Sequence, residues 1–326
     1  MTSPAPASGL AIRASGMTKQ YKEKLALDGV DLAVPRGTVH GLLGPNGAGK
    51  TTAVRILTTL TRLDSGEASV AGFDVRSQAR QVRASIGLTG QQTAVDDLLT
   101  ARQNLTMFGR LFRLDKGTAQ RRADELLELF NLTEAAQRSP KKFSGGMRRR
   151  LDIAASMILA PQVLFLDEPT TGLDPAGRRE VWQAVRDLAD QGATVLLTTH
   201  YLDEADKLCD RISVIDHGQN FVEDSPAGLK RRIGDERLEV VVADPEALPR
   251  VAELIERVLG LEVATEEADG SLSVPVPDGV SALTSVAAEI RAQGIDVADI
   301  GLRRPTLDEA FLHLTHRADT PQEALR

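Results

Sequence analysis

The feature that most constrains the fold of this chain is a glycine-rich segment made of Gly44, Pro45, Asn46, Gly47, Ala48, Gly49, Lys50 and Thr51. It matches the pattern G-x-x-x-x-G-K-[ST], whose glycines let backbone N–H groups turn inward around a phosphate chain. The apolar residues 39–43 before it predict a strand, and residues 53–60 predict a helix after it. Because this strand–loop–helix order is the one that the pattern requires, the sequence predicts a nucleotide site in an α/β fold.

Two residues of this phosphate loop are expected to carry its chemistry. Lys50 is predicted to bind the β- and γ-phosphates of a nucleotide, and the Thr51 hydroxyl to complete the ligand shell of Mg²⁺. The helix that begins at Lys50 also directs its positive N-terminal end at the phosphates. A glycine-rich turn that matches the pattern by chance is the alternative, but the flanking strand and helix favour the nucleotide site.

A second segment, Val163 to Glu168, consists of four apolar residues followed by two carboxylates. A strand that is apolar on both faces is typical of the centre of a parallel sheet, and ligands bind beyond the carboxyl ends of such strands. We therefore expect Asp167 to hold Mg²⁺ and Glu168 to orient and polarise the attacking water. The alternative is a solvated carboxylate pair at the end of a core strand, which the nearby phosphate loop disfavours.

The chain has 326 residues, more than one hydrophobic core usually organises, and the hydrophobic pattern restarts near Gly234. Residues 10–233 are predicted to form a nucleotide-binding domain with a helical insertion at about 98–160, and residues 234–317 a small accessory or dimerisation domain. Residues 1–9 and 318–326 are predicted to be disordered tails. In the second domain the expected element order is β-α-β-β-α-β, that of a ferredoxin-like α+β unit. A last amphipathic helix is expected from about Leu307 to Leu314.

Composition excludes several classes of protein. The net charge of −7, from 39 Lys and Arg against 46 Asp and Glu, argues against a nucleic-acid binder. No apolar run approaches the roughly 18–20 residues that a membrane span needs, and the first residues do not resemble a signal peptide. Cys209 is the single cysteine, which excludes an internal disulfide and fits a reducing compartment. The run Arg148 to Arg150 is expected to form a solvated helix face.

Further segments resemble the ATP-binding cassette (ABC) ATPases. The family signature LSGGQ resembles the run Phe143, Ser144, Gly145, Gly146 and Met147. Phe143 stands where the signature has Leu, and Met147 where it has Gln, but the serine and both glycines are present. The resemblance implies that Ser144 and the two glycine N–H groups form an anion site at a helix N-terminus. In the family this site caps the γ-phosphate bound by the other protomer.

Five other positions resemble residues with known roles in that family. Tyr21 resembles the aromatic residue that stacks on adenine, although a half-buried edge residue is the alternative. His200 resembles the switch histidine that contacts the γ-phosphate, and Asp174 resembles the loop that crosses the dimer interface. Gln91 resembles the glutamine that senses Mg²⁺, and the adjacent Gln92 is the alternative sensor. The family pattern also places Thr52 at the nucleotide.

Two runs of residues indicate which branch of the family the chain resembles. The residues from Gly87 to Gln91 and from Arg304 to Leu312 are similar to those of daunorubicin-resistance-type ATP-binding subunits of drug exporters. The alternative for the second run is a final helix that packs on its own domain, and the two interpretations are compatible.

The resemblance implies a P-loop NTPase that binds ATP and Mg²⁺ and forms an ATP-dependent homodimer on the cytoplasmic side of the cell membrane. It would power the export of hydrophobic drugs or antibiotics through a separate multi-span permease. An exporter subunit for a lipid or polysaccharide is one alternative, and a soluble ABC ATPase without a transport role is another. Soluble members of that kind usually carry two cassettes or long coiled coils, and neither is evident here.

Overall fold

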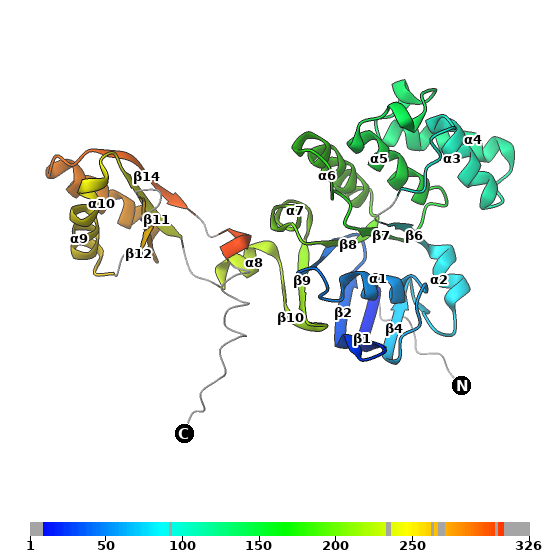
Figure 1. The fold of residues 1–326 in the computed structure, drawn as a ribbon, viewed down its shortest axis with the longest axis horizontal. Coiled ribbons are helices and arrows are strands. Elements are labelled where there is room, and N and C mark those ends of the chain that lie inside the picture. Colours follow the sequence, from blue (N-terminus) through cyan, green and yellow to red (C-terminus); the bar gives the residue numbers. More distant parts are fainter. Residues whose placement is uncertain are drawn as a thin grey trace. The chain divides into compact units, whose positions relative to one another are not determined.

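The computed structural model describes residues 9–90, 93–232, 236–261, 264–266, 271–303 and 306–309 (Figure 1). The chain divides into two compact units, Met1–Pro226 and Ala227–Arg326. This division falls at the first residue of α8 (Pro226–Arg231), earlier in the chain than the boundary expected near Gly234. Gly234 itself lies outside the described residues, as do the expected tails apart from Gly9.

The first unit is built on a six-stranded sheet of order β10-β9-β3-β8-β7-β6. Its strands are β3 (Val39–Leu43), β6 (Ile86–Thr89), β7 (Val163–Asp167), β8 (Thr194–Thr199), β9 (Arg211–Asp216) and β10 (Gln219–Asp224). The pairs from β9 to β6 are parallel, and β10 returns antiparallel to β9. Every residue of β3, β7 and β8 is buried, as the continuous apolar runs predict for central strands. The expected α/β fold is therefore confirmed.

A second sheet of order β2-β1-β4-β5 completes the core of this unit. Its strands are β1 (Leu10–Tyr21), β2 (Lys24–Pro35), β4 (Ser65–Val70) and β5 (Phe73–Asp74), and all of its pairs are antiparallel. Helix α1 (Lys50–Leu57) contacts strands of both sheets. Ala53, Val54 and Leu57 of α1 join one buried cluster with residues such as Ile12 and Phe165. This packing holds the start of α1 rigidly beside the end of β3.

Several helices of the first unit begin at short polar residues that cap them. Helices α3 (Ala101–Leu111), α4 (Lys116–Leu129) and α5 (Gly145–Ser156) occupy the stretch expected to be a helical insertion and lie together in Figure 1. Thr100, Asp115 and Ser144 cap their N-termini through side-chain oxygens, which satisfy free backbone N–H groups. The remaining helices are α2 (Ala79–Ser85), α6 (Pro175–Asp190) and α7 (Leu202–Leu208).

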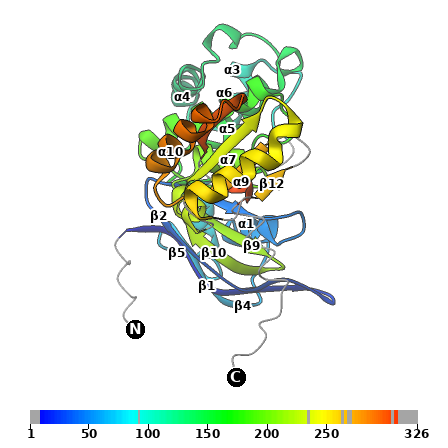
Figure 2. The same cartoon turned by 90° about the vertical axis from the view of Figure 1, so that its left-hand side faces the viewer.

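The second unit contains the element order that the sequence predicts. The elements after α8 are β11 (Arg237–Val242), α9 (Leu248–Leu259), β12 (Ala264–Glu266), β13 (Ser271–Pro275), α10 (Gly279–Ala292) and β14 (Val297–Arg303). The strands form an antiparallel sheet of order β12-β13-β11-β14, on which α9 and α10 lie side by side (Figure 2). Val251, Leu254 and Ile255 bury the apolar face of α9. Of the last expected helix, residues 307–309 are helical and the rest lies outside the described residues.

None of the helices in the described ranges combines the length and apolar character of a membrane span.

Candidate nucleotide site

The phosphate loop joins β3 to α1, as the sequence predicts. Gly47 and Gly49 have φ of 86° and 111°, a backbone conformation that other residues rarely adopt. A Cβ on Gly44 would lie 2.1 Å from the carbonyl oxygen of Ile215, and one on Gly49 would lie 2.6 Å from that of Ala26. No side chain caps the N-terminus of α1. The glycines therefore let the loop pack closely while the first N–H groups of α1 stay uncapped by side chains.

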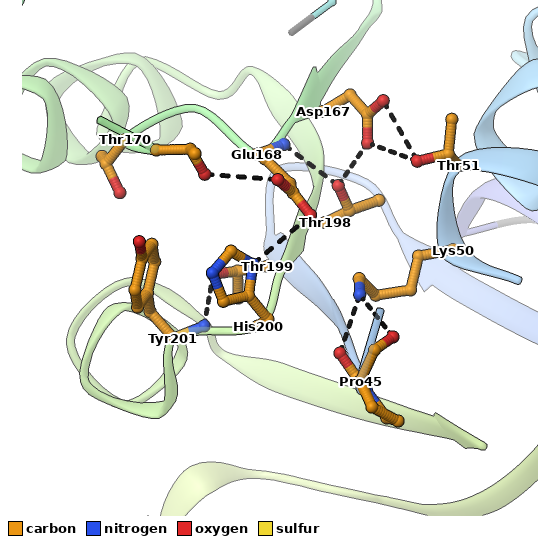
Figure 3. Close-up of polar contacts among 12 residues, drawn as sticks. Pro45, Lys50, Thr51, Asp167, Glu168, Thr170, Thr198, Thr199, His200 and Tyr201 are labelled. Atoms are coloured by element: carbon orange, nitrogen blue, oxygen red, sulfur yellow. Dashed lines mark hydrogen bonds and ion pairs between the residues drawn. The ribbon is translucent and has the colours of Figure 1, made fainter. Parts of the chain in front are cut away.

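Lys50 folds back over the loop. Its Nζ donates hydrogen bonds to the carbonyl oxygens of Gly44 at 2.7 Å and Pro45 at 3.0 Å (Figure 3). Burial lowers the pKa of Lys50, while the Glu168 and Asp167 carboxylates act in the opposite direction. The ammonium is thus a buried cation that the loop carbonyl oxygens hold near the two carboxylates.

Asp167 ends β7 and faces the first turn of α1. The Thr51 hydroxyl donates to its carboxylate at 3.2 and 3.3 Å, and the Thr198 hydroxyl donates at 2.6 Å (Figure 3). Oxygen atoms are the ligands that Mg²⁺ prefers, and Mg²⁺ is commonly held by one or two carboxylates plus substrate phosphates. Thr51 and Asp167 therefore fit a magnesium site. Within the described ranges no group of three His, Cys, Asp or Glu side chains forms a closed metal cage.

Glu168 and His200 extend from neighbouring parallel strands and meet. His200 Nδ1 lies 3.3 Å from Glu168 Oε1, and the Thr171 hydroxyl donates to Glu168 Oε2 at 3.3 Å. Figure 3 shows the imidazole and the carboxylate directed at one another. Glu168 has φ of 49°, a strained conformation for a residue other than glycine. Its backbone N–H donates to the Thr198 hydroxyl at 3.0 Å, which ties it to β8.

Of these groups, Lys50, Thr51 and Glu168 line a cavity of about 320 Å³, near the lower limit for a small-molecule site, whereas Asp167 and His200 are not among its lining residues. The lining residues are Tyr21, Lys24, Ala26, Asn46, Gly47, Gly49, Lys50, Thr51, Thr52 and Glu168. Tyr21 is 44% exposed at the cavity, and Lys19 Nζ lies over its ring, 5.3 Å from the centroid. Lys24 also lines the cavity and was not predicted. It lies opposite Tyr21 in the β1–β2 hairpin, and that pairing was the signal that could have identified it.

The residues of the signature segment lie at the start of α5 and are absent from the described lining of this cavity. The Ser144 hydroxyl caps α5 by accepting from the Met147 N–H at 3.1 Å. Asp174 caps α6 in the same way, accepting from the Gly177 N–H at 2.8 Å. A Cβ on Gly146 would lie 2.9 Å from Gly177 Cα, so the two helices approach closely at their first turns. Gly145 and Glu168 line a separate hollow of about 230 Å³.

Comparison with known proteins decides the family. Residues 27–171 match the ABC transporter family. The daunorubicin resistance ATP-binding protein DrrA2 of Streptomyces coeruleorubidus is 61% identical over 315 residues, covering 96% of this chain and 98% of the relative. The chain belongs to the ABC transporter family. It is an ATP-hydrolysing subunit of the ABC type, as the sequence resemblance implies.

Two further comparisons agree with this assignment. The doxorubicin resistance ATP-binding protein DrrA of Mycobacterium tuberculosis is 49% identical over 311 residues, covering 94% of each chain. A solved dimeric ATP-binding cassette, in a post-hydrolysis state with ADP and Pi, superposes with a TM-score of 0.59 at 27% identity. The superposition covers 66% of this ABC ATPase and 98% of the cassette.

The expectation that the three arginines after the signature form a solvated face is wrong for Arg149 and Arg150. Arg149 is buried in this ABC ATPase and donates to the carbonyl oxygens of Pro169 at 2.8 Å, Gly90 at 2.7 Å and Asp167 at 3.2 Å. It also pairs with Asp152 at 3.3 Å. The Arg150 side chain is largely covered and donates to the Phe130 carbonyl at 2.7 Å. The sequence could not predict this burial, because the carbonyl oxygens that accept hydrogen bonds from Arg149 belong to segments far away along the chain.

Replacing Arg149 by Ala should destabilise the first unit by about 3–5 kcal/mol, because Asp152 would remain buried without its partner. Urea unfolding followed by circular dichroism would measure the change. The matched control is Arg148→Ala, whose partner Asp97 is more exposed and whose loss should cost about 1 kcal/mol or less. Equal losses for the two variants would contradict the structural role of Arg149.

Gln91, the expected Mg²⁺ sensor, and its alternative Gln92 lie outside the described residues. Their flanking backbone is held from both sides: Arg149 donates to the Gly90 carbonyl, and the Ala94 N–H donates to Asp152 at 2.8 Å. The choice between the two glutamines stays a prediction.

Proposed function

We propose that this chain is the ATPase subunit of an efflux transporter that exports hydrophobic drugs or antibiotics through a separate multi-span permease. The observation that carries the proposal is the extent of the resemblance to named resistance proteins. The 61% identity covers 96% of the chain and so includes the second unit, whereas the solved cassette covers 66%. A general ABC ATPase would be expected to share the cassette alone.

In the proposed hydrolysis each residue has a separate task. Tyr21 stacks on adenine, and the loop N–H groups from Gly44 to Thr52 surround the phosphates with Lys50 on the β- and γ-phosphates. Thr51, Asp167 and Gln91 hold Mg²⁺, which when bound neutralises phosphate charge.

Glu168 accepts a hydrogen bond from the attacking water and polarises it, because its carboxylate lies at the edge of the cavity. His200 donates to the γ-phosphate from its position beside Glu168.

We further propose that two copies complete each other's sites. Ser144, Gly145 and Gly146 do not line the phosphate cavity of their own chain, so a second copy would supply them to the γ-phosphate. Asp174 would lie in the loop that crosses this interface. The dimeric cassette among the similar structures supports this arrangement.

The permease would dock at the helical insertion and hold the subunit on the cytoplasmic side of the membrane. A hollow of about 550 Å³ between α3 and α4 is lined by residues that include Leu99, Met107 and Arg110. Beside it, Leu98 is 91% exposed. Apart from Leu99 and Met107 the hollow is lined by polar and charged side chains, so we place the docking surface at these two residues and the exposed Leu98.

The proposal is tested by isolating the tagged chain from gently solubilised membranes of its native cell and identifying bound proteins by mass spectrometry. We expect a near-stoichiometric multi-span protein. Co-expression of this chain with that multi-span protein should lower the accumulation of daunorubicin in the host. The Lys50→Ala variant serves as the inactive control. A membrane partner without an effect on drug accumulation would indicate another exported substrate, such as a lipid or polysaccharide. Recovery without any membrane protein would favour an ABC ATPase with no transport role.

A further inference from the structure

Glu204 is a buried carboxylate outside the motifs. It lies on α7, in the third position of the helix, four residues after His200, and its exposed fraction is 0%. Burying a carboxylate is costly unless hydrogen bonds satisfy it. Nothing in the phosphate loop, the acidic pair or the signature accounts for a carboxylate at this place.

One hydrogen bond to Glu204 comes from the loop that carries Glu168 and a second comes from α6, while Glu204 Oε2 has no hydrogen-bond partner among the described residues. The Thr170 hydroxyl donates to Glu204 Oε1 at 2.7 Å, and the indole N–H of Trp182 donates to the same oxygen at 3.1 Å. Thr170 lies two residues after Glu168, in the loop between β7 and α6. Burial raises the pKa of Glu204, whereas the hydroxyls of Thr199 and Thr170 and the indole N–H of Trp182 lower it. Thr199 directly precedes His200 at the end of β8.

The backbone around Glu168 needs such external support. Its positive φ is strained, and strained residues persist only where the surroundings over-determine them. Glu168 Oε1 and His200 Nδ1 are also 3.3 Å apart, at the outer limit of a hydrogen bond, so a small shift of either loop would separate them. Thr170 is buried, which makes its hydrogen bond to Glu204 part of the core rather than of a mobile surface.

We propose that Glu204 is a positioning residue that keeps the Glu168 loop in register with the His200 loop. The Thr170 hydroxyl of the Glu168 loop donates to a carboxylate in the first turn of α7, the helix that begins two residues after His200. Glu204 touches neither nucleotide nor water; it acts through the two loops. The inference deepens the proposed function and rests on its assignment of Glu168 and His200. A carboxylate suits the task because one oxygen accepts from both Thr170 and Trp182 at once.

The test compares four variants of the full chain with the wild type: Glu204→Ala, Glu204→Gln, Thr170→Val and Asp203→Asn. Glu204→Ala should lower kcat for ATP hydrolysis by on the order of 10- to 100-fold, because misplaced catalytic groups slow chemistry more than binding. The KM for ATP should change little, which marks an interaction that matters in the transition state. Glu204→Gln keeps a carbonyl acceptor for Thr170 and Trp182 and should retain most of the activity.

Two variants distinguish a positioning role of Glu204 from a role in the folding of the chain. Thr170→Val keeps the shape of the side chain and removes one hydroxyl, so kcat should fall with little change in stability. Asp203→Asn is the matched control on the same helix, because asparagine keeps the Oδ1 that accepts from the Glu204 N–H and changes only the charge that pairs with Arg178 on the surface. Emission of Trp182, the single tryptophan of the chain, reports whether each variant is folded around Glu204.

Hydrogen exchange provides a readout that does not depend on turnover. Amides in residues 168–172 and 198–201 should exchange faster in Glu204→Ala, but not in Glu204→Gln or Asp203→Asn. Unchanged exchange and kcat in Glu204→Ala, or equal losses in Glu204→Ala and Glu204→Gln, would overturn the positioning role. Failure of the wild type to bind ATP would instead overturn the proposed function, and the exchange comparison would still decide whether Glu204 holds the two loops.

Discussion

In the Lys50→Ala variant, ATP turnover should fall by about 10²- to 10³-fold, the usual cost of removing one preorganised donor to developing charge. The Lys50 ammonium is held in the loop by the Gly44 and Pro45 carbonyl oxygens, so it requires little reorganisation when phosphates arrive. Alanine cannot replace either its charge or its donors. Release of inorganic phosphate measures turnover, and a fluorescent ATP analogue measures binding in parallel.

The matched control is Lys207→Ala, which removes an exposed lysine at the end of α7. It should behave like the wild type in both assays. Near-normal turnover in Lys50→Ala would refute the assignment of the phosphate site. A loss of the circular dichroism spectrum in that variant would show that the residue is needed for folding, and Lys50→Met would then replace it.

In the Glu168→Gln variant, ATP should bind normally while hydrolysis slows by about 10²- to 10⁴-fold, the typical contribution of a positioned acid or base. The amide keeps the size of the side chain but cannot take a proton from water. ATP bound without turnover should hold two copies together. Size-exclusion chromatography with light scattering, in Mg-ATP, should therefore detect a dimer that is absent with ADP.

A second substitution distinguishes a composite site from simple self-association. Adding Ser144→Arg to Glu168→Gln should prevent the dimer, because a bulky charged side chain would replace the hydroxyl proposed to cap the γ-phosphate of the other copy. ATP binding by each monomer should remain, since Ser144 is not among the residues that line the cavity of its own chain. A monomeric Glu168→Gln variant in Mg-ATP would argue against two copies sharing the sites.

Much of the candidate site could be predicted from local sequence. The phosphate loop is specified by glycines at positions where a side chain would clash or where φ is positive, and these requirements act within a few residues. The apolar run of β7 predicted both its burial and the place of Asp167 at its end. Helical and strand periodicity likewise predicted the element order of the second unit, because each element there buries one face of its own.

Long-range pairing could not be predicted in the same way. Arg149 is buried because acceptors from distant segments converge on it, whereas its residue type alone favours an exposed position.

The sequence by itself determined that this chain carries a phosphate loop, an acidic pair and a signature segment, because each depends on backbone conformations and side chains close together in the chain. Only the tertiary structure decided that β7 and β8 are parallel neighbours, which brings Glu168 against His200. It also decided that Glu204 of α7 accepts a hydrogen bond from Thr170, two residues after Glu168. The physical reason is that strand order and register arise from burial of the whole core, and residues far apart in sequence contribute to it jointly.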